Sequence, residues 1–212
     1  MRTATDDRYR GRGDVKRDYD RPVEARLVDV GSGLAPADEG WFVVGAREAA
    51  WLRNDMFGWH CVFEANPPVV RGRPGLEPTT FPQLGITLAV LEPGKPSGLY
   101  HAESKQEDFL VLAGECLLLI EKEERRLHAW DFVHCPPGTA HAFIGGGEPC
   151  VLLMVGARGA DKRIAYPRSE PAIRHGAGVE EETDSPREAY AAFPHWERGR
   201  PEALDTLLQM PH

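Results

Sequence analysis

The sequence predicts an all-β protein built around one antiparallel barrel or sandwich. Between residues 84 and 158, short apolar runs follow one another at even spacing, and glycine- and proline-rich turns separate them. This pattern is typical of closed or stacked antiparallel sheets. The polar motifs within this stretch are not repeated in either flank, so we expect one barrel and not two fused copies.

The expected strands of this barrel can be placed from composition and turn residues. LGITLAVLEPG ends in a turn, EDFLVLAGE begins with a charged residue and continues as an apolar run, and the following hairpin has its polar turn near 122–124. The expected strand segments are 84–94, 107–115, the two arms of the hairpin within 116–138, 141–144 and 150–158.

The N-terminal flank divides into two parts. Residues 1–20 carry dense mixed charge with almost no apolar side chains, which predicts a disordered arm. Residues 21–83 are expected to form an addition that packs on the barrel. Within it we expect strands at 41–44 and 57–65, helical turns at 46–54 and a connector without regular structure at 66–82.

The C-terminal flank, residues 159–212, is expected to be an extension with short helices. Its first part is polar and irregular, which suits a segment draped over the barrel. Ser185 precedes a proline and stands three residues before Glu188, which is typical of a helix N-terminus over 185–193. A second helix is expected at 201–210, where three leucines share one face. The fold therefore includes a short helical C-terminal tail.

Composition excludes several classes of partner. The net charge of −8 argues against nucleic acid, because phosphate binding needs a basic face. No apolar run is long enough to span a membrane, and the charged N-terminus does not resemble a secretory signal. The four cysteines lie in or beside apolar runs without metal-binding spacing, so reduced buried thiols in a cytoplasmic protein are expected.

Four polar residues near the middle of the chain form the candidate site. His101 and Glu103 stand two residues apart, so in a strand their side chains leave the same face. Glu107 follows a polar turn, and His141 arrives after one strand–turn–strand interval. Two imidazoles with one or two carboxylates converging inside a barrel predict a site for a divalent metal ion.

These residues also carry a resemblance to a known family. Gly94, His101, Glu107 and Gly114 resemble the first cupin motif, and Asp131, Pro136, Gly138 and His141 resemble the second. The resemblance covers roughly residues 84–156. It implies a cupin-type, jelly-roll-like antiparallel β-barrel with one divalent metal ion per chain, of which Fe, Mn, Zn and Ni are candidates. The implied metal ligands are His101, Glu107 and His141.

The sequence departs from the cupin pattern at three positions. Glu103 stands where metal-binding cupins usually carry a second histidine, six residues instead of five separate Gly94 from His101, and Trp130 replaces a glycine. Glu103 is therefore open to three interpretations. It is a fourth metal ligand, a catalytic acid or base at the edge of the metal, or a structural carboxylate. Ligation is the interpretation that we favour here.

The expected function follows from the site. Two histidines and a carboxylate resemble the facial triad of non-heme iron, so we expect an enzyme that acts on a small polar molecule, with dioxygenase-like chemistry favoured. The alternatives are an isomerase or epimerase, with or without metal, and a non-catalytic binding or sensor protein. A 2-oxoglutarate oxygenase ranks low, because no Arg-x-Ser pair follows His141.

Two further expectations concern residues outside the four. His60 and His134 are expected to be packed and hydrogen-bonded, as lone barrel histidines usually are. The aromatic-rich segment 41–63 and the helix at 201–210 offer more apolar surface than a small barrel covers, which predicts a homodimer.

Overall fold

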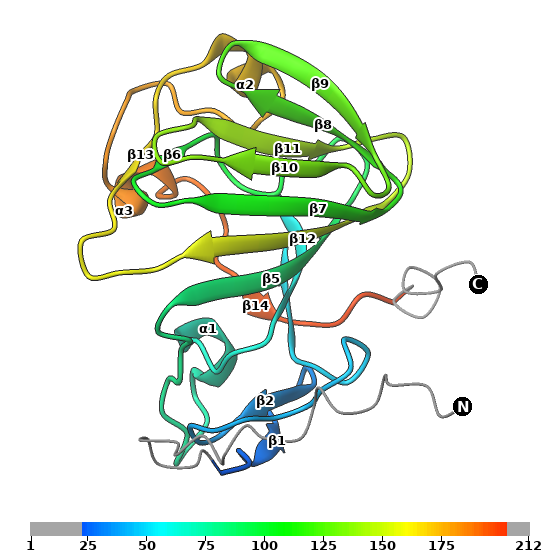
Figure 1. Cartoon of the computed structure of the whole chain (residues 1–212), viewed down its shortest axis with the longest axis vertical. Helices are drawn as coiled ribbons and strands as arrows, with labels where there is room; N and C mark the ends of the chain where they lie inside the picture. The colour runs from blue at the N-terminus through cyan, green and yellow to red at the C-terminus, as the bar shows by residue number, and fades with distance from the viewer. Residues whose placement is uncertain (1–22, 203–212) are drawn as a thin grey trace, which may run out of the picture.

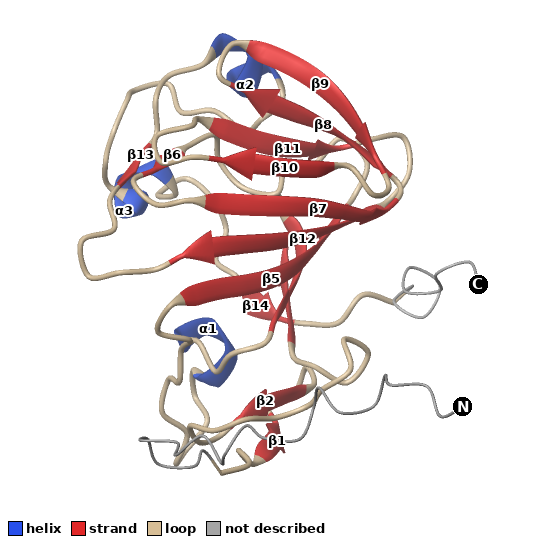
Figure 2. Ribbon diagram, viewed as in Figure 1, coloured by secondary structure: helices blue, strands red, loops and turns tan. Residues whose placement is uncertain are grey.

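The computed structural model of the chain describes residues 23–202 (Figure 1). The arm predicted at 1–20 and the helix predicted at 201–210 therefore lie, wholly or almost wholly, outside the described residues. Strands dominate the remainder, and the few helices are short (Figure 2). The predicted all-β fold with antiparallel pairing is confirmed.

Two sheets enclose the core of the barrel. The larger has seven strands in the order β10-β7-β12-β5-β4-β3-β14, and the smaller has three in the order β11-β8-β9. The strands of the larger sheet are β3 (Trp51–Asn54), β4 (Gly58–Val62), β5 (Leu84–Leu91), β7 (Glu107–Ala113), β10 (Phe132–Cys135), β12 (Cys150–Ala157) and β14 (Glu197–Arg198). The strands of the smaller sheet are β8 (Glu115–Ile120), β9 (Glu123–His128) and β11 (His141–Gly145).

Short elements surround these sheets. The first strands among the described residues are β1 (Leu27–Asp29) and β2 (Leu34–Pro36), which form a hairpin. Strand β6 (Ala102–Glu103) pairs with β13 (Ile164–Ala165) beside the barrel. The helices are α1 (Pro67–Val70), α2 (Glu170–Arg174) and α3 (Pro186–Ala189). Helix α2 packs on the outer face of the smaller sheet, where its Ala172 belongs to one buried cluster with Leu119 of β8 and Ile144 of β11. Helix α3 lies at one edge of the barrel (Figure 1).

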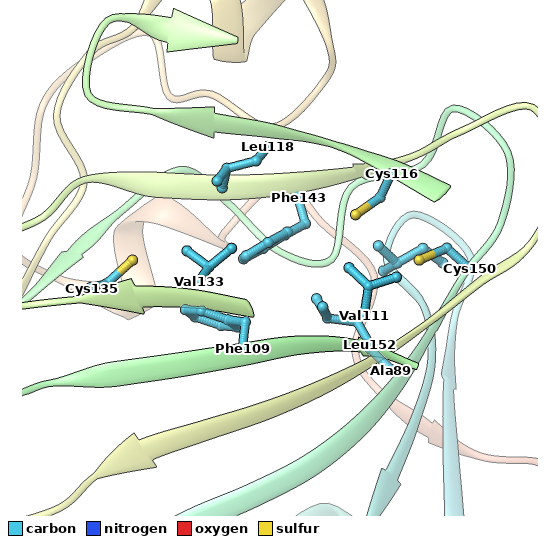
Figure 3. Close-up of a cluster of buried hydrophobic side chains, with 11 residues drawn as sticks. Ala89, Phe109, Val111, Cys116, Leu118, Val133, Cys135, Phe143, Cys150 and Leu152 are labelled. Carbon is cyan, nitrogen blue, oxygen red and sulfur yellow. The ribbon is translucent and has the colours of Figure 1, made fainter. Parts of the chain in front are cut away.

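The main core lies between the two sheets. Phe109 and Val133 of the larger sheet face Phe143 and Leu118 of the smaller one (Figure 3). Leu152 of β12 is fully buried in this cluster. All four cysteines are buried as well. The alternating burial of Phe109 and Val111 in β7 follows from its position, because the strand turns one face inward.

Several elements differ from the sequence-based expectation. The helical turns expected at 46–54 are confirmed for one turn at 46–48 and wrong beyond it, because Trp51 begins β3, pairs with Cys61 of β4 and is fully buried. Alanine and leucine favour helix only weakly, and burial in a sheet overrides that preference. The strand expected at 41–44 is reduced to an isolated bridge at Trp41.

Of the three helices in the described part of the chain, the sequence predicts α3 but not α1 or α2. The segment 66–82 contains α1, whose N-cap Asn66 accepts a hydrogen bond from the amide of Val69. Helix α2 was also missed, although Ser169 caps it in the same way. The helix start at Ser185 is confirmed, since its hydroxyl accepts a hydrogen bond from the amide of Glu188. Short helices depend on such caps more than on a hydrophobic period.

We expect Leu152→Ala to lower the free energy of unfolding by about 2–5 kcal/mol, because it removes a fully buried side chain and leaves a cavity between the sheets. Urea denaturation followed by circular dichroism measures this loss. Leu84→Ala on β5 is the matched control, because Leu84 is 45% exposed. Equal effects of the two substitutions would show that this core is not the main source of stability.

Candidate metal centre

Three of the four predicted site residues converge at one end of the barrel. Glu107 is the first residue of β7, His141 is the first residue of β11, and His101 immediately precedes β6. The backbones of His101 and His141 are bridged by a pair of hydrogen bonds, His101 N to His141 O and His141 N to His101 O. This bridge holds the two imidazoles side by side, with ring centroids 5.0 Å apart.

The ligand atoms of these three residues face one another. One ligand atom from each of His101, Glu107 and His141 lies within 4.8 Å of the other two. The carboxylate oxygen Oε2 of Glu107 lies 3.8 Å from Nε2 of His101 and 3.6 Å from Nε2 of His141. These separations are too long for hydrogen bonds, so the carboxylate and the imidazoles do not satisfy one another directly.

The second nitrogen of each imidazole is held by the backbone. Nδ1 of His101 lies 2.7 Å from the carbonyl oxygen of Leu99, and Nδ1 of His141 lies 3.0 Å from that of Thr139. A carbonyl only accepts hydrogen bonds, so each Nδ1 carries the hydrogen and each Nε2 presents its lone pair to the site. This tautomer is the one that a metal-binding histidine needs.

The geometry fits a first-row divalent ion. Metal–ligand bonds of about 2.0–2.2 Å place neighbouring ligand atoms about 3–3.5 Å apart. The separations of 3.6 and 3.8 Å in this structure need to shorten by well under 1 Å. Two imidazoles with one carboxylate favour iron, manganese, zinc or nickel over calcium or magnesium, which prefer oxygen ligands.

The charge balance of the site also fits a cation. Burial, and secondarily the negative charge of Glu103, raise the pKa of Glu107 to about 8. Burial lowers the pKa of His141 to about 4 and lowers that of His101 as well. Both imidazoles are therefore neutral near pH 7 and cannot balance the carboxylate. A bound cation would stabilise the ionised form of Glu107.

Glu103 lies beside this group and not within it. Its carboxylate forms an ion pair with Lys162 and is largely buried, and it also lies near the carboxylate of Glu107. The structure therefore brings Glu103 to the edge of the three-residue group, with one oxygen directed to a lysine. Its role as a fourth metal ligand stays a prediction.

The three ligands open onto a cavity of about 260 Å³. This volume is below the range of pockets for drug-sized ligands, which suits a small metabolite. Sequence reasoning missed several of its lining residues, namely Gly85, Gly156, Arg158, Lys162 and Tyr190. The alternation along β5 and β12 could have placed Gly85 and Gly156 on the inner face, but no motif marks the others.

His134 and His60 have different surroundings. His134 is exposed, so the expectation that it is packed is wrong, whereas the expected hydrogen bonding is confirmed by the 2.6 Å separation of its Nδ1 from the carboxylate of Asp108. His60 lines the cavity and stacks on Trp196 with ring centroids 4.2 Å apart. Its Nε2 is buried without a hydrogen-bond partner among the described residues, whereas the ring also forms a hydrogen bond with the backbone of Ser97. The expectation is therefore correct for its packing and for one of its two ring nitrogens.

Within residues 23–202, no helix has the length and apolar composition needed to cross a membrane. The homodimer and the cytoplasmic location stay predictions.

Comparison with known proteins gives matches to one family. The model of the cupin domain family matches residues 87–156. No curated protein matches the chain. Among solved structures, a sugar phosphate isomerase of the cupin superfamily from Silicibacter pomeroyi is 22% identical, with a TM-score of 0.40, and the match covers 69% of this chain and 82% of that one.

Two further structures are similar at the same level. A DMSP lyase from Ruegeria pomeroyi is 26% identical with a TM-score of 0.37, and the match covers 44% of this chain and 48% of that one. A cupin 2 conserved barrel domain protein from Salinispora arenicola is 27% identical with a TM-score of 0.35, covering 40% of this chain and 71% of that one. The family match falls on the barrel strands that hold Glu107 and His141 and on the bridge at His101. Residues 87–156 of this chain form a cupin type-2 domain.

Proposed function

We propose that the protein is a metal-dependent enzyme that acts on a small polar molecule, with dioxygenase-like chemistry favoured. The observation that carries this proposal is the arrangement of His101, Glu107 and His141, whose ligand atoms lie within 4.8 Å of one another at the wall of a small cavity. A bound ion would supply Lewis acidity and coordination positions for substrate and dioxygen.

The residues around the ligands suit this use. The carbonyls of Leu99 and Thr139 fix the orientation of the two imidazoles, so little reorganisation is needed when an ion binds. Phe109 lies against His141, with ring centroids 4.9 Å apart, and keeps water from that side of the ring. The cavity side of the group has no such cover, because His101 and Glu107 both line the cavity there.

A metal-dependent isomerase or lyase is the second candidate, and one observation favours it. Glu103 and Lys162 form an ion pair beside Glu107, which places a carboxylate and an ammonium group next to the candidate metal ligands. Such a pair can move a proton between two positions of a bound substrate. This chemistry needs no dioxygen, so the two candidates differ in their requirement for an oxidant.

We expect purified wild-type protein, reconstituted with Fe(II) under anaerobic conditions, to bind about one ion per chain, and His101→Ala and His141→Ala to lose it. Each substitution removes one of the three candidate ligands found among residues 23–202. Elemental analysis after gel filtration measures the content. His134→Ala is the matched control, because His134 is exposed and bonded to Asp108.

Nitric oxide tests the open coordination positions without a known substrate. Fe(II)-loaded wild-type protein should give the high-spin iron–nitrosyl signal in electron paramagnetic resonance, as an ion with an exchangeable position does. Equal metal content in the wild type and both histidine variants would show that the metal binds at another site. Full iron content without a nitrosyl signal would argue against the oxygenase and leave the isomerase.

We expect the metal-free wild type to lose stability relative to Glu107→Gln as pH rises from about 5 to 8. A glutamate carboxyl group has a pKa of 4.5 in the unfolded chain, whereas the pKa of Glu107 in the folded protein is about 8. The raised folded value means that the protonated carboxyl favours folding below pH 4.5, and that this contribution is lost as pH rises through 8. The slope is at most about 1.4 kcal/mol per pH unit.

Urea titrations at several pH values, with chelator present, measure this difference in unfolding free energy. Adding Zn(II) should reverse the trend for the wild type and leave Glu107→Gln almost unchanged, because the ion stabilises the ionised carboxylate. A difference that stays constant from pH 5 to 8 would contradict the assignment of Glu107 as a buried carboxylate without a compensating cation.

We expect Glu103→Gln to keep the affinity for Mn(II) within about threefold of wild type, because the carboxylate is directed to Lys162 and lies outside the group of three. Competition with a metal-sensitive dye measures the affinity. Lys162→Met is the companion variant, since it removes the other half of the pair. A loss of affinity of tenfold or more in Glu103→Gln alone would support the ligand interpretation made from the sequence.

A further inference from the structure

One hydroxyl group at the wall of the cavity donates no hydrogen bond within the described part of the chain. Tyr190 directly follows α3, and its phenol oxygen Oη accepts a hydrogen bond from the backbone amide of Leu99 at 3.0 Å. This bond uses a lone pair of the oxygen and leaves its hydrogen unused. Among residues 23–202, the phenol hydrogen has no acceptor. The hydroxyl is therefore a donor that is available to a bound molecule.

The ring of Tyr190 is held by packing against other aromatic rings. Its centroid lies 5.5 Å from that of Phe57 and 6.0 Å from that of Phe193. Tyr166 lies edge-on to it at 5.9 Å. A phenylalanine would make the same contacts, because they involve the ring and not the hydroxyl. Packing explains the ring and the bond to Leu99 explains one lone pair, but neither uses the O–H group.

The hydroxyl end of Tyr190 is the part that reaches the cavity. Gly98 and Leu99 line the cavity together with Tyr190. Oη is bonded to the amide of Leu99, and a Cβ atom added at Gly98 would lie 3.2 Å from it. Oη thus lies against two residues of the cavity wall, whereas the ring contacts the aromatic cluster.

Leu99 also connects this hydroxyl to the candidate metal centre. Its amide donates to Oη of Tyr190, and its carbonyl oxygen lies 2.7 Å from Nδ1 of His101. The phenol oxygen and the imidazole are therefore separated by the backbone of a single residue. The cavity of about 260 Å³ is lined by both of these residues and by Glu107 and His141. A small molecule bound to the metal would therefore lie close to the hydroxyl.

The charge state of Tyr190 determines which group it would bind. Burial raises the pKa of Tyr190 above its ordinary value, so the phenol keeps its proton near pH 7 and acts as a donor. Arg158 and Lys162 line the cavity as well, but each is already paired with a carboxylate. Because a buried anion needs a countercharge, the phenol suits an uncharged oxygen acceptor.

We propose that Tyr190 binds the substrate, and that its O–H group donates a hydrogen bond to an uncharged hydroxyl, ether or carbonyl oxygen of a molecule whose other end coordinates the metal. This inference rests on the proposed metal-dependent function and adds a substrate-binding residue. It also restricts the substrate, which must carry one oxygen function for the ion and a second one for the phenol. Tyr190 sets the specificity for the second oxygen.

The test uses hydroxamates, which bind zinc through their own two oxygens and differ in the group at the other end. Glycolohydroxamate and 3-hydroxypropionohydroxamate carry a hydroxyl, whereas propionohydroxamate and butyrohydroxamate carry a methyl group at the same position. The two matched pairs place the hydroxyl at two distances from the ion. Isothermal titration calorimetry with the full-length Zn(II)-loaded protein gives the affinity ratio of each pair. Zinc content is measured in the same samples.

Tyr190→Phe removes the donor and keeps the ring. In at least one pair, we expect the preference for the hydroxyl over the methyl group to fall by about fivefold or more relative to the wild type, with zinc content unchanged. The comparison of ratios isolates the contact, because a change in cavity shape affects both members of a pair.

Tyr166→Phe is the matched control. It removes the same group from the same aromatic cluster, at a ring 5.9 Å from that of His101, but Tyr166 is not one of the residues that line the cavity. This variant should keep the preference of the wild type.

A fluorine label reports on the contact without removing the hydroxyl. When Tyr190 is replaced by 3-fluorotyrosine, the fluorine lies next to the hydroxyl, and its NMR signal responds to the hydrogen bond that the hydroxyl makes. We expect a larger shift with the hydroxyl-bearing hydroxamate of a pair than with its methyl counterpart. This measurement decides the question if Tyr190→Phe does not fold.

The possible results separate the two proposals. Zinc-loaded protein with the same preference in the wild type and Tyr190→Phe, for both pairs, overturns the role of Tyr190 and leaves the metal centre. Loss of the preference in Tyr166→Phe as well, or equal fluorine shifts within both pairs, has the same consequence. Failure of the wild type to hold zinc, or to bind any of the hydroxamates when loaded, contradicts the proposed function and this inference with it.

Discussion

The register between β5, β12 and β7 is the constraint on which the candidate site depends. Residues that lie opposite one another in these three strands form rows across the inner face of the sheet. The size and polarity of their side chains differ from row to row. Ala89, Leu152 and Val111 form a filled apolar row, Thr87, Met154 and Phe109 form the next, and Gly85, Gly156 and Glu107 form the last. Slipping one strand by a single residue would turn its inner residues to the other face. The same pairing therefore closes the core at one end of the barrel and opens the cavity at the other.

The position of Glu107 at the end of these apolar rows determines the pKa of its carboxyl group. The apolar rows end directly beside Glu107, so its carboxylate is largely buried and its pKa is raised to about 8. The neighbouring imidazoles are neutral near pH 7 and offer lone pairs but no charge. A site with strong donors and an unbalanced carboxylate favours a cation over water. Part of the free energy of metal binding would then come from stabilising the ionised form of Glu107, which burial disfavours.

The sequence predicts the parts of this structure that local spacing controls. His101, Glu107 and His141 follow from short motifs, and their strands follow from apolar runs between turn residues. The helical turns expected at 46–54 end after one turn, because Ala49, Ala50 and Trp51 are buried and tertiary burial overrides weak helix preference. The contact between Glu64 and Arg158 joins residues 94 positions apart, and no local pattern signals it.

The family match covers the barrel but not the segments that flank it, which limits what it says about the cavity. The matched stretch, residues 87–156, contains all three candidate metal ligands. Glu64 and Gly85 come before it, whereas Arg158, Lys162 and Tyr190 come after it, and the last four of these line the cavity. The two basic side chains that line the cavity, Arg158 and Lys162, thus lie outside the stretch that defines the domain. The family match therefore assigns the fold and the candidate ligands but not the reaction, because one fold supports many reactions.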